Sequence, residues 1–280
     1  MIKDRDTNTV YFSEHILTNN EYISAFKRIQ FLLDKHNVKY KFLTNTKDIW
    51  CRDYMPIQIE NDEFVQFRYE PTYLESELEL QSDPKQVLES NKITANFSSI
   101  NLDGGNVIKW SDKAILTTRI FEENPIMSST ELTKELERLL KTDILFVPNI
   151  KDDMTGHADG HIRFIDSKTV LVNELKNELG YWRNGFLKMV KQAGLDFVEI
   201  PWFEHKDKNF KYSAIGGYVN YLEVDNLILF PVFEIDKNKD KQALAVIESV
   251  FPNRIIEPIN VNEIANHGGL LNCTTWTVKQ

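Results

Sequence analysis

Four short polar clusters interrupt otherwise apolar segments of the sequence, and each contains side chains that can do chemistry. They are DIWCRDYMPI around Asp53, NLDGGNVI around Gly104 and Gly105, TGHADGHIRF around His157, and HGGLLNCTTW around Cys273. A thiol near an imidazole and carboxylates can act as a thiolate nucleophile, because its reactivity depends on a lowered pKa. Together the clusters predict a cysteine-dependent hydrolase with Cys273 as its nucleophile.

The two cysteines of the chain are expected to differ in role. A lone cysteine in an apolar strand is usually a small buried hydrophobe. The residues on either side of Cys273 are polar, which favours a reactive thiol there. Cys51 lies beside Arg52 at the end of an apparently packed strand, so we expect it to be inert. The sequence alone leaves a disulfide between the two cysteines open.

The cluster GHADGH contains His157, Asp159 and His161. On a strand these three side chains would point to the same side, because side chains alternate with a period of two. Imidazole and carboxylate ligands suit zinc or iron, so a metal-dependent hydrolase is one interpretation. No second His/Cys pair of clear spacing supplies further ligands. A single histidine with a nearby carboxylate equally supports proton transfer, which is the interpretation we favour.

Asp53 and Asp159 lie in different clusters and suggest what the site binds. A planar guanidinium group carries a fork of donors that carboxylates meet in a bidentate manner. Two carboxylates from different loops can hold such a cation from two edges. Taken alone, Asp53 could instead pair with Arg52 or cap a turn.

Helical and strand patterns alternate along the chain. Apolar residues at helical spacing predict helices near residues 20–36, 129–141, 178–194 and 237–249. Short runs of aromatic and β-branched residues between them, such as KAILTT, TVLVN and GYVNYLEV, predict strands. The helix and strand units look like versions of one module, and the two chain ends are placed to close a ring of such modules. This ring would bring the polar loops together at one end. The acidic segment 71–96 is expected to be a solvated loop with a short helix.

Composition limits the possible number of domains, the partners and the location of the protein. The chain has 280 residues, of which 42% are hydrophobic and 27% charged, with a net charge of −9. No linker divides it, so we expect a single domain over residues 1–280. Basic residues are scattered, which argues against nucleic-acid binding, and no apolar run approaches a membrane span. With only two cysteines and a polar amino terminus, the chain is expected to be cytoplasmic.

Five motifs, in order, resemble the agmatine deiminase and bacterial-type peptidylarginine deiminase family of guanidine-modifying enzymes. The motifs are WCRDYMP (50–56), LDGGN (102–106), GHADGHIRF (156–164), YVNY (218–221) and GGLLNCTT (268–275). The resemblance implies an α/β fold, the pentein or α/β propeller, with five ββαβ-type modules around a pseudo-fivefold axis. The active site would lie at the centre of the ring.

The resemblance also assigns roles to particular residues. It implies that Cys273 is the nucleophile and His157 the general acid and base, while Asp53 and Asp159 bind the guanidinium. No metal or other cofactor is expected. The substrate would be a small cationic guanidino compound, either free or as peptidyl-arginine, and a homo-oligomer is left open. Further substrate-binding candidates are Trp50, Arg52, Gly104, Gly105, Asn106 and Asn220.

Three positions depart from the family pattern. Met55 replaces a common glycine, Asn272 replaces the histidine that often precedes the cysteine, and Trp276 begins a different carboxy-terminal ending. These departures leave the substrate open between agmatine and arginine derivatives. An amidinotransferase, another guanidine hydrolase, a metal-dependent hydrolase and a non-catalytic binding protein are the alternative functions. Trp50, Tyr54 and Trp276 are aromatic candidates for a pocket wall.

Overall fold

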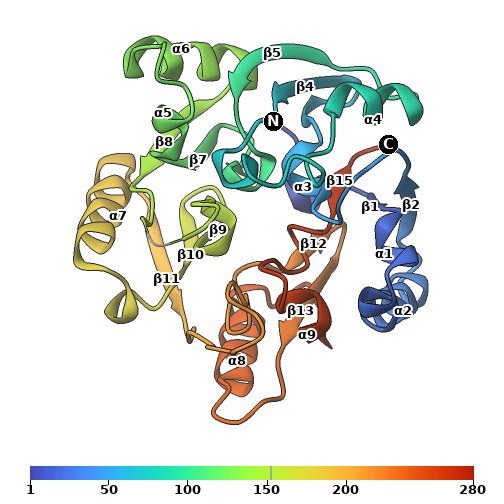
Figure 1. Ribbon diagram of the computed structural model, residues 1–280. Coiled ribbons are helices and arrows are strands. Elements are labelled where there is room, and N and C mark those ends of the chain that lie inside the picture. The colour runs from blue at the N-terminus through green and yellow to red at the C-terminus, as the bar shows by residue number, and fades with distance from the viewer. Residues whose placement is uncertain (152) are drawn as a thin grey trace.

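Five small sheets surround a common centre in the computed structural model, which describes residues 1–151 and 153–280. Figure 1 shows the sheets arranged as a ring, with the longer helices on the outside and the amino terminus near the middle. Each sheet has three strands, in the orders β3-β4-β5, β6-β7-β8, β9-β10-β11, β12-β13-β14 and β15-β1-β2. The ring of repeated units predicted from the sequence is therefore confirmed.

Every sheet repeats one pattern of pairing. In the fourth, β12 (Leu222–Val224) pairs antiparallel with β13 (Leu227–Val232), and β13 pairs parallel with β14 (Ile255–Asn260). A parallel pair needs a crossover connection, which α8 (Asp240–Val250) supplies on the outside of the ring. Three other modules are continuous in the sequence. The first consists of β3 (Ile57–Glu60), β4 (Glu63–Arg68), α4 (Pro84–Ser90) and β5 (Asn96–Asn101), and the second of β6 (Ile108–Lys109), β7 (Lys113–Thr117), α5 (Arg119–Glu122), α6 (Ser129–Leu140) and β8 (Asp143–Val147). The third consists of β9 (Ile162–Phe164), β10 (Thr169–Asn173), α7 (Gly180–Ala193) and β11 (Asp196–Ile200).

The fifth module is built from both ends of the chain. The carboxy-terminal strand β15 (Trp276–Val278) pairs antiparallel with β1 (Thr9–Ser13), which pairs parallel with β2 (Lys39–Leu43). The helices α1 (His15–Thr18) and α2 (Asn20–Lys35) connect β1 to β2. The ring thus closes through hydrogen bonds between the first and last strands.

The four predicted helices are present, and local sequence explains their limits. Helix α6 begins with a capping box in which Ser128 and Glu131 bond each other's backbone N–H. Its Leu132, Leu136 and Leu140 recur at helical spacing and are all buried. In segment 71–96 the short helix is α4. Among the described residues, no helix is long and apolar enough to cross a bilayer.

Two predicted strand segments are turns instead. The run GYVNYLEV is a strand only over β12, and its first part is a series of turns after Gly216, which has a φ of +100°. The GHADGH segment forms the 3-10 turn η4 (Ala158–Gly160) rather than a strand. Glycine adopts such left-handed backbone without strain, and this lets the chain leave the strand path.

The aromatic candidates for a pocket wall separate in the structure. Tyr54 and Trp276 are buried, at 0% and 3% exposure, in one apolar cluster that also contains Met55. The indole N–H of Trp276 donates to the Pro56 carbonyl at 2.7 Å. These side chains therefore belong to the core, and Trp50 is the aromatic candidate that stays partly exposed.

Candidate active site

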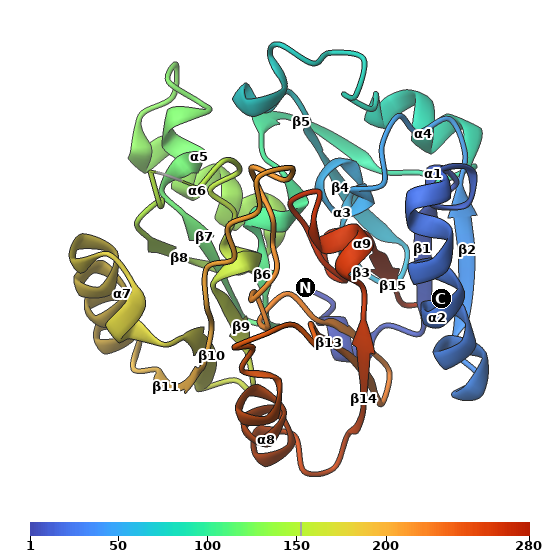
Figure 2. The ribbon, with the colours of Figure 1, turned by 60° about the horizontal axis from the view of Figure 1, so that its bottom comes forward.

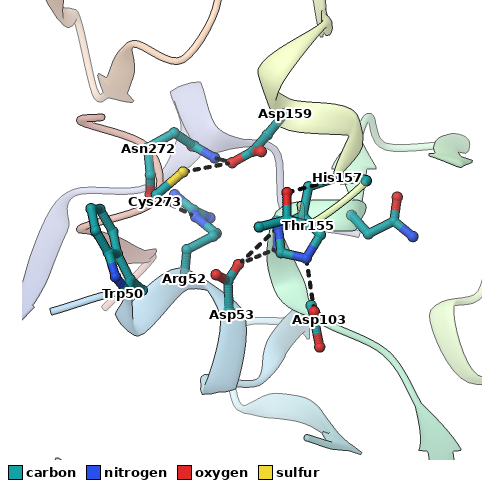
Figure 3. A network of polar contacts seen from close by, with 12 residues as sticks. Trp50, Arg52, Asp53, Asp103, Thr155, His157, Asp159, Asn272 and Cys273 are labelled. Carbon is teal, nitrogen blue, oxygen red and sulfur yellow. Dashed lines mark hydrogen bonds and ion pairs between the residues drawn. The ribbon is translucent and has the colours of Figure 1, made fainter. Parts of the chain in front are cut away.

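The polar clusters of the sequence are the loops that immediately precede the inner strands of the ring. The one-turn helix α3 (Cys51–Tyr54) precedes β3, and the 3-10 turn η3 (Gly104–Asn106) precedes β6. In the same way η4 precedes β9, and residues 218–220 and 270–275 precede β12 and β15. Because the inner strands share one axis, these five loops meet at one end of it. Figure 3 shows the side chains that converge there.

Cys273 is a partly exposed member of this group. Its Sγ lies 3.5 Å from Asp159 Oδ2, and the Asn220 amide donates to it at 3.1 Å. Burial raises the pKa of the Cys273 thiol well above its usual range, and the charges of Asp159 and Asp53 raise it further. Cys273 is therefore a neutral thiol at neutral pH, and solvent can reach it.

Two asparagines hold the loop that carries Cys273. Asn220 Oδ1 accepts hydrogen bonds from the backbone N–H groups of Asn272, at 3.1 Å, and Cys273, at 3.3 Å. The Asn272 side chain donates to Asp159 Oδ2 at 2.7 Å. Asn272 was not among the predicted site residues. Its sequence signals were its place next to the cysteine and its departure from the family pattern.

His157 lies between two carboxylates, both from other modules. Its Nε2 is 2.8 Å from Asp103 Oδ2, and its Nδ1 is 3.6 Å from Asp53 Oδ1. Burial lowers the pKa of His157, but Asp53 and Asp103 outweigh burial and raise it to about 10. His157 is therefore an imidazolium at neutral pH. Asp103 was not among the predicted site residues, although its place beside the Gly-Gly pair was a signal.

The residues of η3 shape the site through close backbone approach. Gly105 N–H donates to Asp53 Oδ1 at 3.0 Å, and a Cβ on Gly105 would lie 2.6 Å from both Asp53 Oδ1 and His157 Nδ1. A Cβ on Gly104 would collide with the carbonyl of Arg52. Asn106 Oδ1 accepts the N–H of Thr117 and fixes the turn to β7. The contacts of Gly104 and Asn106 are thus with the protein's own backbone.

Trp50 and Arg52 flank Cys273 differently. The Trp50 ring lies beside Cys273 and packs so closely on Gly269 that a Cβ there would be 2.4 Å from it. Arg52 is 5% exposed, and its Nε donates to the Asn272 carbonyl at 3.2 Å. Trp50 thus stays partly exposed beside Cys273, whereas Arg52 supports the cysteine loop.

His161 is directed away from Cys273, so the expectation that His157, Asp159 and His161 share one side is wrong. The turn η4 replaces the strand on which that expectation depended. His161 Nε2 is 3.4 Å from Asp153 and its Nδ1 is 3.8 Å from Glu178. Among the residues that the structure describes, no group of three His, Cys, Asp or Glu side chains is arranged to hold a metal ion.

Cys51 is fully buried and free, and Cys273 is free as well. The Cys51 thiol donates to the Thr274 carbonyl at 3.2 Å. Burial raises the pKa of the Cys51 thiol well above its usual range, which disfavours the reactive thiolate. The expectation that Cys51 is an inert core residue agrees with this placement, and the disulfide left open by the sequence is not formed.

Asp103→Asn is expected to shift the alkaline limb of any activity that needs protonated His157. Asparagine keeps an acceptor near Nε2 but removes one of the three carboxylate charges, those of Asp53, Asp103 and Asp159, that raise the pKa of His157 to about 10. The pKa of His157 should fall, so activity should be lost about one pH unit earlier as pH rises. The measurement is a kcat–pH profile, with exposed Asp112→Asn as the control. An unmoved alkaline limb would contradict the role given to Asp103.

Comparison with solved structures places this architecture in the pentein fold. Agmatine deiminase of C. jejuni superimposes with a TM-score of 0.81 at 17% identity, over 100% of this chain and 96% of that one. Agmatine deiminase of Enterococcus faecalis superimposes with a TM-score of 0.72 at 14% identity, over 100% and 95% of the two chains. At these identities the likeness concerns the fold.

The family model for Porphyromonas-type peptidyl-arginine deiminase matches residues 9–278, so the chain belongs to that family. Among curated relatives, agmatine deiminase of Pseudomonas aeruginosa is 25% identical over 210 residues, which are 63% of this chain and 55% of that enzyme. Agmatine deiminase of Pseudomonas putida is 23% identical over 292 residues, covering 87% and 77%. The match thus spans little more than half the length of the P. aeruginosa relative.

Proposed function

We propose that this protein hydrolyses a guanidino substrate, agmatine or an arginine derivative, to a ureido product and ammonia. The observation that carries the proposal is the geometry around Cys273. A partly exposed thiol contacts one buried carboxylate, Asp159, and faces a second carboxylate, Asp53, that is paired with an imidazolium. Family membership and the agmatine deiminases among the relatives support the same chemistry.

The buried acids make the site suited to a cation. Asp53, Asp103 and Asp159 are each at most 8% exposed, and among residues 1–151 and 153–280 His157 is the one cation that contacts this group directly. Burial raises the pKa of Asp53, with further raising by Asp103 and Asp159, which His157 partly opposes. A guanidinium held between Asp53 and Asp159 supplies the missing positive charge. Its donor fork matches the carboxylates, and its central carbon is presented to Sγ.

In the first half of the reaction the thiol is activated by the substrate. The positive charge of the bound guanidinium offsets Asp53 and Asp159, the two charges that raise the pKa of Cys273, so the thiol gives its proton to water and becomes a thiolate when the substrate is present. This proton later converts the released ammonia to ammonium. Sγ forms a bond to the guanidino carbon. His157 gives its proton to the leaving nitrogen, the C–N bond breaks, and ammonia departs from a covalent thiouronium.

In the second half water replaces the sulfur. His157, now neutral, takes a proton from water as the oxygen bonds to the same carbon. The C–S bond then breaks and returns the thiol, leaving a ureido group on the product. The sum is guanidinium plus water giving urea derivative plus ammonium, which balances without a redox partner. No step requires a metal or an organic cofactor.

We also propose a cytoplasmic location, because two free thiols suit a reducing compartment.

The names of the relatives and of the family carry different substrates, agmatine and peptidyl-arginine, so both substrate classes belong in the test. The purified protein, without added metal, is incubated with agmatine, arginine and a peptidyl-arginine, and ammonia and ureido product are quantified. Equimolar ammonia and ureido product from any of the three supports the proposal. Absence of both from all three would contradict it.

A further inference from the structure

The axis of the ring is filled by polar side chains. Each inner strand places one near its middle, and all five are at most 8% exposed. They occupy equivalent places in the five sheets, since each is paired with the middle strand of its own module. These axial residues are Gln58, Lys109, Arg163, Glu223 and Thr277.

Asp4 enters this axis from the amino-terminal 3-10 turn η1 (Asp4–Asp6). Its carboxylate is 3.0 Å from Lys109 Nζ and 3.0 Å from Arg163 Nη2, and it accepts a bond from the Thr277 hydroxyl at 3.4 Å. Burial would raise the pKa of Asp4, but the neighbouring cations hold it well below its usual range. Asp4 is therefore an anion that neutralises a buried cationic cluster.

The amino-terminal segment 1–8 covers the end of the axis opposite to Cys273. The catalytic loops precede the inner strands, whereas this segment bonds to residues that end or follow them. Its hydrogen bonds join Met1 to Ser111, Arg5 to Ile165, Thr7 to Asp225 and Asn8 to Val278. The segment thus closes the ring behind the site, which agrees with the central position of the amino terminus in Figures 1 and 2.

Arg52 connects Asp4 to the nucleophile. Its Nη1 is 3.7 Å from Asp4 Oδ1, and its Nε donates to the Asn272 carbonyl at 3.2 Å. Its backbone N–H donates to the carbonyl of Cys273 at 3.2 Å. Nη2 of Arg52 is buried without a hydrogen-bond partner among the described residues. The orientation of the guanidinium therefore depends on the contacts made by Nε and Nη1.

We propose that Asp4 is a positioning residue for catalysis, which acts through Arg52 to hold the Asn272–Cys273 backbone in its reactive place. The inference rests on the deiminase function proposed above. Without Asp4, Arg52, Lys109 and Arg163 would lose the carboxylate that they share, and the other axial acid, Glu223, is paired with Arg5 and Arg254, so the Arg52 guanidinium would move. A misplacement of about 1 Å can cost about 100-fold in rate.

The test compares Asp4→Asn with Asp6→Asn, an isosteric change in the same turn at an exposed carboxylate. Asp4→Asn should lower kcat about tenfold or more and leave KM within about twofold, because the guanidinium-binding carboxylates are untouched. Hydrogen–deuterium exchange should rise in peptides covering residues 51–54 and 270–275 but not in α7. Asp6→Asn should change neither. The exchange measurement needs no turnover. If the wild type were inactive, the proposed deiminase function would be refuted, and the exchange measurement would still test whether Asp4 holds the cysteine loop.

Removing Asp4 leaves buried cations unpaired, which could destabilise the protein by itself. The comparison is therefore repeated in a Lys109→Met background. The double variant Lys109→Met, Asp4→Asn loses one positive and one negative charge, so its axial cluster has the same net charge as in the wild type. A double-mutant cycle with Arg52→Lys, which keeps the charge but loses the Nε bond, supplies the mechanism. If Asp4 acts through Arg52, the two losses in kcat are far from additive. Additive losses, or uniform exchange increases with kcat unchanged, would overturn the proposal.

Discussion

Cys273→Ala is expected to reduce kcat for deimination by about 10⁴-fold or more. The mutation removes the partly exposed thiol beside Asp159, whereas the other cysteine of these loops, Cys51, is buried, so no covalent thiouronium can then form. Asp159, which lies 3.5 Å from Sγ, and the remaining site residues keep their positions, so substrate should still bind. The measurement is single-turnover ureido formation beside equilibrium binding of the substrate.

Cys51→Ser is the matched control for this change. Cys51 is buried and donates to the Thr274 carbonyl, a bond that a serine hydroxyl can also make. It should retain activity within about threefold, the loss being one of stability rather than of chemistry. Mass spectrometry after acid quench should find a substrate-derived adduct on wild type and on Cys51→Ser, and none on Cys273→Ala. Full turnover by Cys273→Ala would refute the proposed nucleophile.

His157→Gln is expected to lower kcat by about 10²- to 10⁴-fold, the usual contribution of a positioned acid or base. Glutamine can hydrogen-bond but cannot give a proton to departing ammonia or take one from water. The pKa of His157 is raised to about 10, so the wild type has the proton at neutral pH and loses it as pH rises through that value. The alkaline limb of the wild-type profile should therefore disappear in His157→Gln.

His161→Gln separates this role from a metal-dependent mechanism. His161 faces Asp153 and Glu178 rather than Cys273, so its replacement should change kcat by less than about tenfold. The two variants are compared by kcat under identical conditions, with folding checked by thermal unfolding. Equal losses in both would show that the two histidines act as one unit, which is the metal-dependent alternative.

Much of the fold and site could be predicted because the signals are local. Leucines at helical spacing predicted α6, and apolar runs predicted the middle strands of the sheets. The ordered motifs indicated the family and with it Cys273, His157 and the two aspartates, whose roles stay proposals. Prediction failed where a turn replaced a strand, at η4 and before β12, because glycine makes both conformations accessible at similar cost.

Contacts between distant loops were beyond the reach of the sequence. His157 and Asp103 are 54 positions apart, and Asn272 and Asp159 are 113 apart. Nothing in the local pattern states which acid will face which base. Asp4 is a stronger case, since a single aspartate near the amino terminus has no sequence signal at all, yet it lies within 3.7 Å of Arg52.

The sequence by itself determined the family, the helices and strands, and the side chains able to do chemistry. Only the tertiary structure decided their charge and their partners: His157 as an imidazolium, Cys273 as a neutral thiol, and Arg52 as a link between Asp4 and the cysteine loop. The physical reason is that protonation and orientation depend on burial and on charges brought together by the closed ring. Those quantities belong to the folded arrangement of five modules and to no segment alone.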